Sequence, residues 1–228
     1  MKIIYEDENI LIADKPREIE VVSESGEEDF LAILKRETEQ DLRAVHRLDR
    51  NTAGLVLAAK NAPALRAMNA VIKHRQLHKY YLCAVHGVPR PEAATLHAYL
   101  RRDRSEFEVS VSGAPAPGYV PIATRYRTLR AKNGLALLEI ELLTGRTHQI
   151  RAHMAHIGHP LLGDGKYGEH GAYMADRAAG YSRQALLSYK IEFDFDEQFL
   201  SDAAPLGYLN GMSFQLPTEG LEFVRMFE

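Results

Sequence analysis

Short apolar runs that alternate with polar turns dominate this chain and predict a protein built largely on β-sheet. Residues 2–5 and 10–13 are two such runs around a polar tetrapeptide, which predicts an antiparallel pair. The second strand should end at Asp14-Lys15-Pro16, because proline cannot donate to a sheet ladder. Apolar side chains at helical spacing instead predict helices over residues 29–36 and 63–73, the second with Leu65, Met68 and Ile72 on its apolar face.

The later part of the chain shows the same alternation of strands, turns and a helix. Asn133-Gly134 is a strong hairpin-turn signal between two apolar runs. The segment over 147–157 can form a helix, and a Gly- and Ala-containing connection follows Gly168. A second hairpin is expected over 99–111, with arginines at its tip. The predicted strands of this part cover 55–59, 77–87, 121–129, 135–143 and 185–193.

One stretch brings charge and a buried strand together: His46-Arg47-Leu48-Asp49-Arg50-Asn51-Thr52-Ala53-Gly54. Asp49 lies between two arginines in the loop that leads onto the apolar run over 55–59. A nearby guanidinium keeps a carboxylate ionised, and an ionised, positioned aspartate can act as a nucleophile or a base. The alternative is that Asp49 only caps a turn and pairs with a surface arginine.

Composition limits the protein class without naming a function. The chain has 228 residues, of which 46% are hydrophobic and 26% charged, and this is typical of one globular domain. Its single cysteine, Cys83, excludes an internal disulfide framework and fits a reducing compartment. No apolar run approaches the ~18 residues of a membrane span. We therefore expect a cytoplasmic protein without a membrane partner.

Charge is distributed unevenly along the chain. The total is −3, but residues 43–104 carry 12 basic and 3 acidic side chains, whereas residues 1–42 carry 5 basic and 13 acidic ones. A basic region can follow a phosphate backbone whatever the total charge of the protein. The uneven distribution therefore leaves nucleic-acid binding open.

Two further stretches carry candidate functional residues. In the predicted strand over 77–87, alternation places Lys79 and Tyr81 on one face. The second stretch begins at Thr144-Gly145-Arg146-Thr147-His148-Gln149-Ile150-Arg151-Ala152-His153. It ends at Gly158-His159-Pro160-Leu161-Leu162-Gly163-Asp164-Gly165-Lys166-Tyr167-Gly168.

In this order, the three stretches resemble the motifs of the RluA-type RNA pseudouridine synthases: HRLD-x-x-T-S-G, K-x-Y-x-x-x-V-x-G and T-G-R-T-H-Q-I-R-x-H with G-H-P-x-x-G-D and Y-G. The resemblance covers about residues 2–193. Ala53 stands where the pattern usually has serine. Asp14-Lys15-Pro16 resembles the end of the family's opening segment. Arg17-Glu18 follows it where the family commonly has a small residue and glycine, so this loop is expected to differ in backbone shape.

The resemblance implies an α+β fold, the pseudouridine synthase fold, in which helices and loops flank a mixed, mostly antiparallel central sheet. It implies one catalytic domain over 1–228 without a separate N-terminal RNA-binding module. The implied reaction converts a uridine in structured RNA to pseudouridine, and it requires no cofactor or energy source because no group is added or removed. The base must leave the helical stack and turn inside a closed pocket.

The resemblance also implies roles for individual residues. Asp49 is the essential carboxylate, which attacks the ribose or the base or takes a proton; the sequence does not choose among these. Arg151 aligns with the basic partner of that aspartate, and Tyr81 stacks under the uracil. Without the neighbouring motifs Tyr81 would be taken as a core residue. Arg47 and, more weakly, Arg146 are candidate RNA contacts, together with His46 and Lys79.

Two other function classes remain as alternatives. A non-catalytic RNA-binding or RNA-folding protein on the same scaffold would need phosphate contacts but no ionised Asp49. A metal-dependent hydrolase could use His148, His153, His156 and His159, but their spacing matches no common zinc motif. The RNA partner is ribosomal RNA or tRNA, with ribosomal RNA favoured because it is common in the family. A monomer is the expected oligomeric state.

Overall fold

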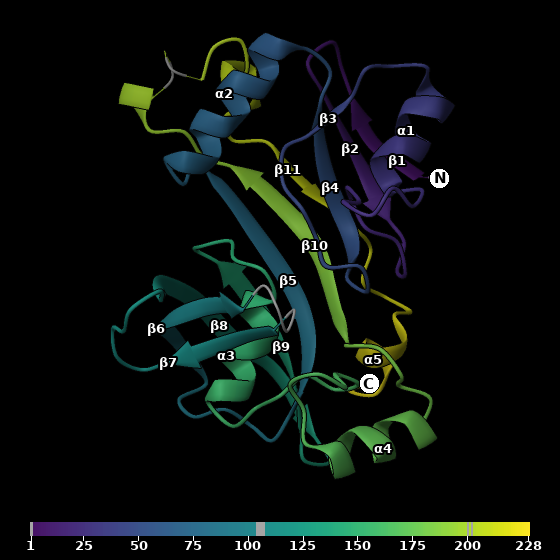
Figure 1. The fold of residues 1–228 in the computed structure, drawn as a ribbon, viewed down its shortest axis with the longest axis vertical. Helices are drawn as coiled ribbons and strands as arrows, with labels where there is room; N and C mark the ends of the chain where they lie inside the picture. The colour runs from purple at the N-terminus through teal and green to yellow at the C-terminus, as the bar shows by residue number, and fades with distance from the viewer. Residues whose placement is uncertain (1, 104–107, 200, 202) are drawn as a thin grey trace. The chain divides into compact units, whose positions relative to one another are not determined.

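The chain forms two compact units (Figure 1), and the computed structural model describes residues 2–103, 108–199, 201 and 203–228. Unit 1 comprises Met1–Lys79 and Ser188–Leu216, and unit 2 comprises Tyr80–Leu187 and Pro217–Glu228. Each unit combines antiparallel strands with helices, which confirms the predicted α+β class. The single catalytic domain over 1–228 stays a prediction.

Unit 1 is built around strands that the apolar runs predicted. The strand order is β1-β2-β4-β10, with β3 paired to β4 and β11 paired to β10. β1 and β2 form the expected antiparallel pair, and β2 ends at Lys15 as predicted. The strands are β1 (Lys2–Glu6), β2 (Ile10–Lys15), β3 (Arg43–Ala44), β4 (Ala53–Ala59), β10 (Leu186–Phe193) and β11 (Ser213–Gln215).

The two helices of unit 1 begin at side-chain caps. Asp29 caps α1 (Phe30–Thr38) by accepting from the N–H of Ala32 at 2.7 Å. Asn61 caps α2 (Ala62–Lys73) in the same way. Unit 1 also contains the short 3₁₀ helices η1 (Glu197–Phe199) and η2 (Gly207–Leu209).

The buried side of α2 differs from the prediction. Met68 is buried as expected, but Leu65 and Ile72 are only partly buried. The helix instead buries Ala64, Ala67, Met68 and Val71. Small side chains let a helix pack closely, and the apolar pattern alone did not distinguish this stripe from the neighbouring one.

Unit 2 is a five-stranded antiparallel arrangement in the order β5-β9-β8-β6-β7. Its strands are β5 (Leu77–His86), which begins in unit 1, β6 (Ala93–Asp103), β7 (Glu108–Ser112), β8 (Val120–Lys132) and β9 (Leu135–Leu142). The turn between β8 and β9 has φ of 53° at Asn133 and 76° at Gly134, which confirms the predicted hairpin. The hairpin predicted over 99–111 corresponds to β6 and β7, but residues 104–107 at its tip lie outside the described residues.

The helices of unit 2 were predicted less well. The helix expected over 147–157 is α3 (Gln149–His156), which begins two residues later because His148 has φ of 54° and cannot continue a right-handed helix. The connection expected after Gly168 contains α4 (His170–Ala178), and a last short helix, α5 (Glu222–Arg225), was missed. α3 packs on one face of β6, β7 and β8, where Ala152 joins a buried cluster with Ala98, Leu100, Val109 and Ile122.

Candidate active site

Asp49 lies in the loop between β3 and β4, as the sequence predicted. The preceding Leu48 is buried, and the N–H of Thr52 donates to the carbonyl oxygen of Asp49 at 2.9 Å, which closes a tight turn. β4 follows at once and is buried from Gly54 to Ala59. The half-buried Asp49 therefore lies four residues before a strand that is buried along almost its whole length.

Gly54 explains why this motif ends in glycine. Its φ is 117°, and a Cβ atom at this position would lie 2.1 Å from the carbonyl oxygen of Ser188 in β10. A side chain at residue 54 would therefore separate two adjacent strands directly behind the Asp49 turn.

Lys15 anchors the Asp49 loop through a hydrogen bond to the Arg50 carbonyl oxygen. Sequence reasoning missed this role. Its side chain is fully buried, and Nζ donates to the carbonyl oxygens of Pro16 at 2.8 Å, Ile19 at 2.7 Å and Arg50 at 3.1 Å. Burial lowers the pKa of Lys15 to about 8, although the negative charges of Asp49 and Glu20 oppose this shift. The ammonium group thus ties the end of β2 to the residue that follows Asp49.

His46 and Lys79 lie close enough to influence each other in unit 1. His46 Nε2 accepts from the N–H of Leu57 at 3.2 Å, so it supports β4 directly. Burial, with the positive charge of Lys79 as the second cause, lowers the pKa of His46 to about 3. Burial also lowers the pKa of Lys79. His46 is therefore neutral at physiological pH, and an RNA contact by His46 would have to be a hydrogen bond rather than an ion pair.

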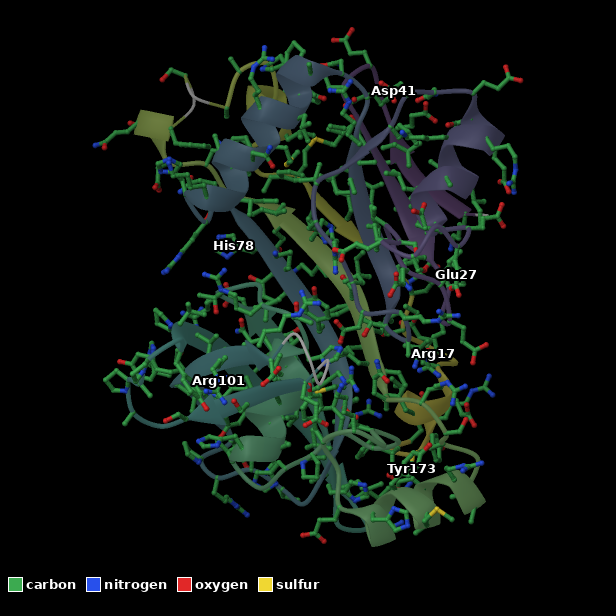
Figure 2. The ribbon with its side chains drawn as sticks, viewed as in Figure 1. Arg17, Glu27, Asp41, His78, Arg101 and Tyr173 are labelled. Carbon is green, nitrogen blue, oxygen red and sulfur yellow. The ribbon has the colours of Figure 1, made fainter. Side chains whose placement is uncertain are left out.

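Arg47 and Arg50, on either side of Asp49, are exposed and reach the acidic segment that precedes α1. Arg47 Nη1 lies 3.3 Å from Glu24, and Arg50 Nη1 lies 3.3 Å from Glu27, which is labelled in Figure 2. All four side chains are more than half exposed. Exposed pairs of this kind are weak, so a phosphate group can replace the glutamate on either arginine.

Tyr81 lies in β5 of unit 2 and is 4% exposed. It pairs with Ile140 in β9, and alternation places its side chain on the same face as Cys83 and Val85, as predicted. Its ring is held by a strand that is buried from Tyr81 to Val85, so this residue has a fixed position in the unit.

Arg151 is buried in α3 and held by a carboxylate that sequence reasoning did not assign. Its Nε donates to Asp164 Oδ2 at 2.7 Å and its Nη2 to Asp164 Oδ1 at 2.9 Å. Burial acts to raise the pKa of Asp164, but the hydrogen bonds from Arg151 and from the N–H groups of Lys166 and Tyr167 hold it below its ordinary value. This two-point contact fixes the plane of the guanidinium group.

The aromatic ring of Tyr167 adds a second restraint on Arg151. The ring lies 5.1 Å from the guanidinium carbon, within the range of a cation–π contact. The hydroxyl of Tyr167 is in turn 2.7 Å from His148 Nδ1. Tyr167 and His148, which belong to the same third motif, therefore contact each other beside Arg151. Their membership of one motif is the sequence signal from which this contact could have been predicted.

The turn before α3 presents Arg146 at the surface. Gln149 Oε1 accepts from the N–H of Arg146 at 3.1 Å and from Thr144 Oγ1 at 2.9 Å, and Gln149 Nε2 donates to the carbonyl oxygen of Ala123 at 3.0 Å. These bonds fix the backbone of the turn while the Arg146 side chain stays exposed. The geometry is compatible with a phosphate contact by Arg146.

The predicted site residues thus fall into two sets. Unit 1 carries Asp49, His46, Arg47 and Lys79, and unit 2 carries Tyr81, Arg146 and Arg151. The supporting residues that the structure adds are Lys15 in the first set and Asp164 with Tyr167 in the second.

Three of the histidines of the third motif have individual hydrogen-bond partners. In addition to the His148 contact, His153 Nδ1 is 3.0 Å from Thr124 Oγ1, and His159 Nδ1 is 2.9 Å from the carbonyl oxygen of His86. Over residues 2–103, 108–199, 201 and 203–228, no three side chains of His, Cys, Asp or Glu are arranged to hold a metal ion. In the same part of the chain, no helix is both long and apolar enough to cross a membrane.

Comparison with known proteins points to one family. A family model described as RNA pseudouridylate synthase matches residues 9–156. The chain is 33% identical over 213 residues to ribosomal large subunit pseudouridine synthase C of Vibrio vulnificus, covering 90% of this chain and 65% of that protein. It is 34% identical over 212 residues to ribosomal large subunit pseudouridine synthase D of Xylella fastidiosa, covering 85% of this chain and 61% of that protein.

A solved structure supports the fold. Human RNA pseudouridylate synthase domain containing 1 superposes with a TM-score of 0.71 at 21% identity, covering 99% of this chain and 94% of that chain. The likeness to this human protein confirms the predicted fold. The chain spans less than two thirds of the length of the two bacterial relatives, 65% and 61%.

Proposed function

The chain belongs to the RluA-type RNA pseudouridine synthase family, and we propose on this basis that it converts uridine in structured RNA to pseudouridine. The observation that carries the proposal is the anchoring of the motif aspartate. Asp49 sits on a closed turn between a buried lysine contact at Arg50 and a strand whose Gly54 tolerates no side chain. A catalytic carboxylate needs such a fixed position, whereas a carboxylate that only binds solvent does not.

Asp49 is the proposed catalytic residue. The reaction breaks the bond between the uracil nitrogen and the ribose carbon and forms a carbon–carbon bond between the same two rings. The proton displaced from the uracil carbon moves to the ring nitrogen that lost the ribose, so atoms and charge balance without a cofactor. Asp49 serves as the nucleophile on ribose or base, or as the group that carries this proton.

Arg151 and Tyr81 complete the proposed catalytic set. The guanidinium of Arg151 is held in one plane by Asp164 and Tyr167. Its position in the third motif assigns it as the basic partner of the catalytic aspartate. Tyr81 supplies an aromatic surface for a uracil that has left the RNA stack. These roles rest on the motif positions and on the burial of α3 and β5 around them.

The proposed RNA contacts are Arg47, Arg146, His46 and Lys79. Arg47 and Arg146 are exposed cations that can reach phosphates, and Arg47 would exchange Glu24 for a phosphate group. His46 is neutral and also supports β4, so its contribution to RNA binding would be a hydrogen bond. We propose RNA as the partner of a cytoplasmic monomer, with ribosomal RNA favoured over tRNA because both bacterial relatives are named for the large ribosomal subunit.

The test is mass spectrometric mapping of pseudouridine in total RNA from the source organism with and without this gene. A pseudouridine should disappear on deletion and return with the wild-type gene but not with Asp49→Asn. This variant keeps the size of the side chain, so it should fold and still bind RNA, and circular dichroism with an RNA-binding assay checks both. Normal pseudouridine formation by Asp49→Asn would refute the proposed mechanism, and wild-type behaviour of this variant in RNA-folding assays would favour a non-catalytic role.

A further inference from the structure

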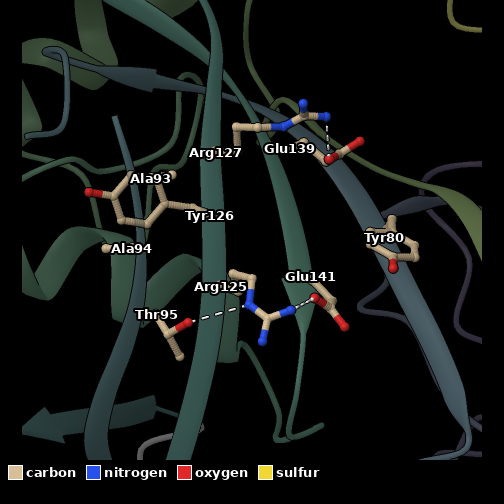
Figure 3. A pocket seen from close by; sticks show the side chains of 9 residues that line it. All are labelled: Tyr80, Ala93, Ala94, Thr95, Arg125, Tyr126, Arg127, Glu139 and Glu141. Atoms are coloured by element: carbon tan, nitrogen blue, oxygen red, sulfur yellow. Dashed lines mark hydrogen bonds and ion pairs between the residues drawn. The ribbon is translucent and has the colours of Figure 1, made fainter. Parts of the chain in front are cut away.

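β8 carries a row of cations on the sheet face opposite to α3. Arg125 pairs in register with Glu141 and Arg127 with Glu139, whereas Ile122 and Tyr126 are buried on the other face of the strand. Ile122 packs with Ala152 of α3, which identifies the side that the helix covers. The arginines therefore point away from α3, and Figure 3 shows Arg125 and Arg127 beside their glutamates.

A β-bulge extends this row to the end of the hairpin. The register between β8 and β9 shifts between Thr128 and Arg130, after which Arg130 faces Leu137 and Lys132 faces Leu135. Leu135 and Leu137 lie on the same face of β9 as Glu139 and Glu141, because alternate residues of a strand share a face. Simple alternation would have placed Leu129 and Ala131 here, so the bulge brings two more cations to this face.

The four cations differ in their partners. Arg125 Nη1 is 2.6 Å from Glu141, and Arg127 Nη2 is 2.9 Å from Glu139. Arg130 and Lys132 are exposed, face leucines, and have no ion pair within the part of the chain that the structure describes. Among the described residues, the two positive charges at the open end of the row thus have no carboxylate to neutralise them.

The same face is hollowed beside the arginines (Figure 3). A cavity of about 340 Å³ is lined by Tyr80 of β5, by Ala93 and Thr95 of β6, and by Arg125, Arg127 and both glutamates. Thr95 Oγ1 accepts from Arg125 Nε at 3.4 Å. The row of cations therefore borders a concave surface that combines the ring of Tyr80 with hydrogen-bonding groups.

We propose that this face of β8 and β9 is a second RNA-contact surface for a single-stranded segment. The phosphates of the segment contact Arg130 and Lys132, and one of its nucleotides lies beside the Arg125–Glu141 pair. The inference rests on the proposed function for the identity of the partner. Residues two apart on a strand present charges ~6.6 Å apart, a spacing that suits successive groups of an extended backbone. Cations with an aromatic surface are typical of single-strand binding.

The surface lies in unit 2 alone, and none of its residues carries a proposed catalytic role. RNA bound here would contribute affinity through phosphates and would not change the chemical step. We therefore expect its loss to raise KM and to leave kcat unchanged, because the contact is equally strong in the ground state and the transition state.

The test compares Arg130→Gln/Lys132→Gln with Arg66→Gln/Lys73→Gln, a control pair of exposed cations on α2 that loses the same charge. Binding of a fluorescent poly(U) oligonucleotide is titrated over a range of salt concentrations. Two lost phosphate contacts on a single strand should reduce the slope of log K against log salt by about 1.4. The control pair should keep the wild-type slope, and Arg130→Lys/Lys132→Arg should keep it as well because both charges remain.

A variant with the opposite sign excludes a general folding defect. Glu139→Gln releases Arg127 from its carboxylate, so it should tighten poly(U) binding and steepen the salt dependence. An unchanged slope in Arg130→Gln/Lys132→Gln, or an equal change in the α2 control, would overturn the inference. Turnover is measured separately: absence of pseudouridine formation by the wild type would refute the proposed function, whereas an unchanged slope in an active enzyme would refute only this surface.

Discussion

The strongest test of the site geometry is the removal of the ammonium group of Lys15. Lys15→Met keeps the length of the buried side chain and leaves the carbonyl oxygens of Pro16, Ile19 and Arg50 without their donor. Three hydrogen bonds from a charged group are worth about 5–9 kcal/mol. The variant also escapes the cost of burying the charge, which a pKa of about 8 places at about 3 kcal/mol.

The hydrogen bonds outweigh the desolvation cost, so Lys15→Met should lower the free energy of unfolding by about 2–6 kcal/mol. This is a large part of the stability of an ordinary domain. Urea unfolding followed by circular dichroism measures the change, and Lys73→Met, an exposed lysine of α2, is the control, which should change stability by less than ~0.5 kcal/mol. Pseudouridine formation by the variant should also fall, because the Arg50 carbonyl next to Asp49 is no longer held.

The free energy of unfolding that depends on Lys15 should change with pH. Because burial places the pKa of Lys15 at about 8 in the folded protein, the folded state binds fewer protons than the unfolded state from about pH 8 to the ordinary lysine range near 10.4. Stability linked to Lys15 therefore rises with pH across this window. The difference in unfolding free energy between wild type and Lys15→Met should be larger at high pH than at neutral pH. A wild-type unfolding midpoint for Lys15→Met, or a difference that shrinks above pH 8, would refute the reasoning.

Two other perturbations test the supports of the site. Gly54→Ala places a Cβ atom 2.1 Å from the Ser188 carbonyl oxygen at a φ of 117°. The substitution should therefore destabilise the protein by at least ~2 kcal/mol. An unchanged melting temperature would contradict the close approach of β4 and β10. Asp164→Asn leaves the buried Arg151 charge without its carboxylate and should cost about 3–5 kcal/mol in urea unfolding. The pKa of Asp164 is held below its ordinary value, so the stability that the Asp164 carboxylate contributes is present at neutral pH. This stability is lost as the pH falls below the ordinary aspartate range. An equal difference in unfolding free energy between wild type and Asp164→Asn at pH 7 and in strong acid would therefore contradict the prediction.

Some parts of this protein follow from the sequence alone because they depend on neighbouring residues. The strands β1, β2, β4, β5 and β10 coincide with apolar runs bounded by turn residues. The β8–β9 hairpin follows from Asn133-Gly134, whose backbone adopts the positive φ that this turn requires. The three motifs, in their order along the chain, identify the family that the comparison then confirmed.

Tertiary structure decided the features that depend on residues distant in the chain. Lys15 and Arg50 are 35 residues apart, and no local pattern shows that the lysine supports the Asp49 loop. α2 buries Ala64, Ala67 and Val71 with Met68 rather than Leu65 and Ile72, because the surface that it packs against decides which apolar stripe is covered. The bulge that turns Arg130 and Lys132 to one face is likewise a property of strand pairing. The sequence determines the backbone locally, whereas the partners of a buried charge and the face of a strand exist only once the chain has folded.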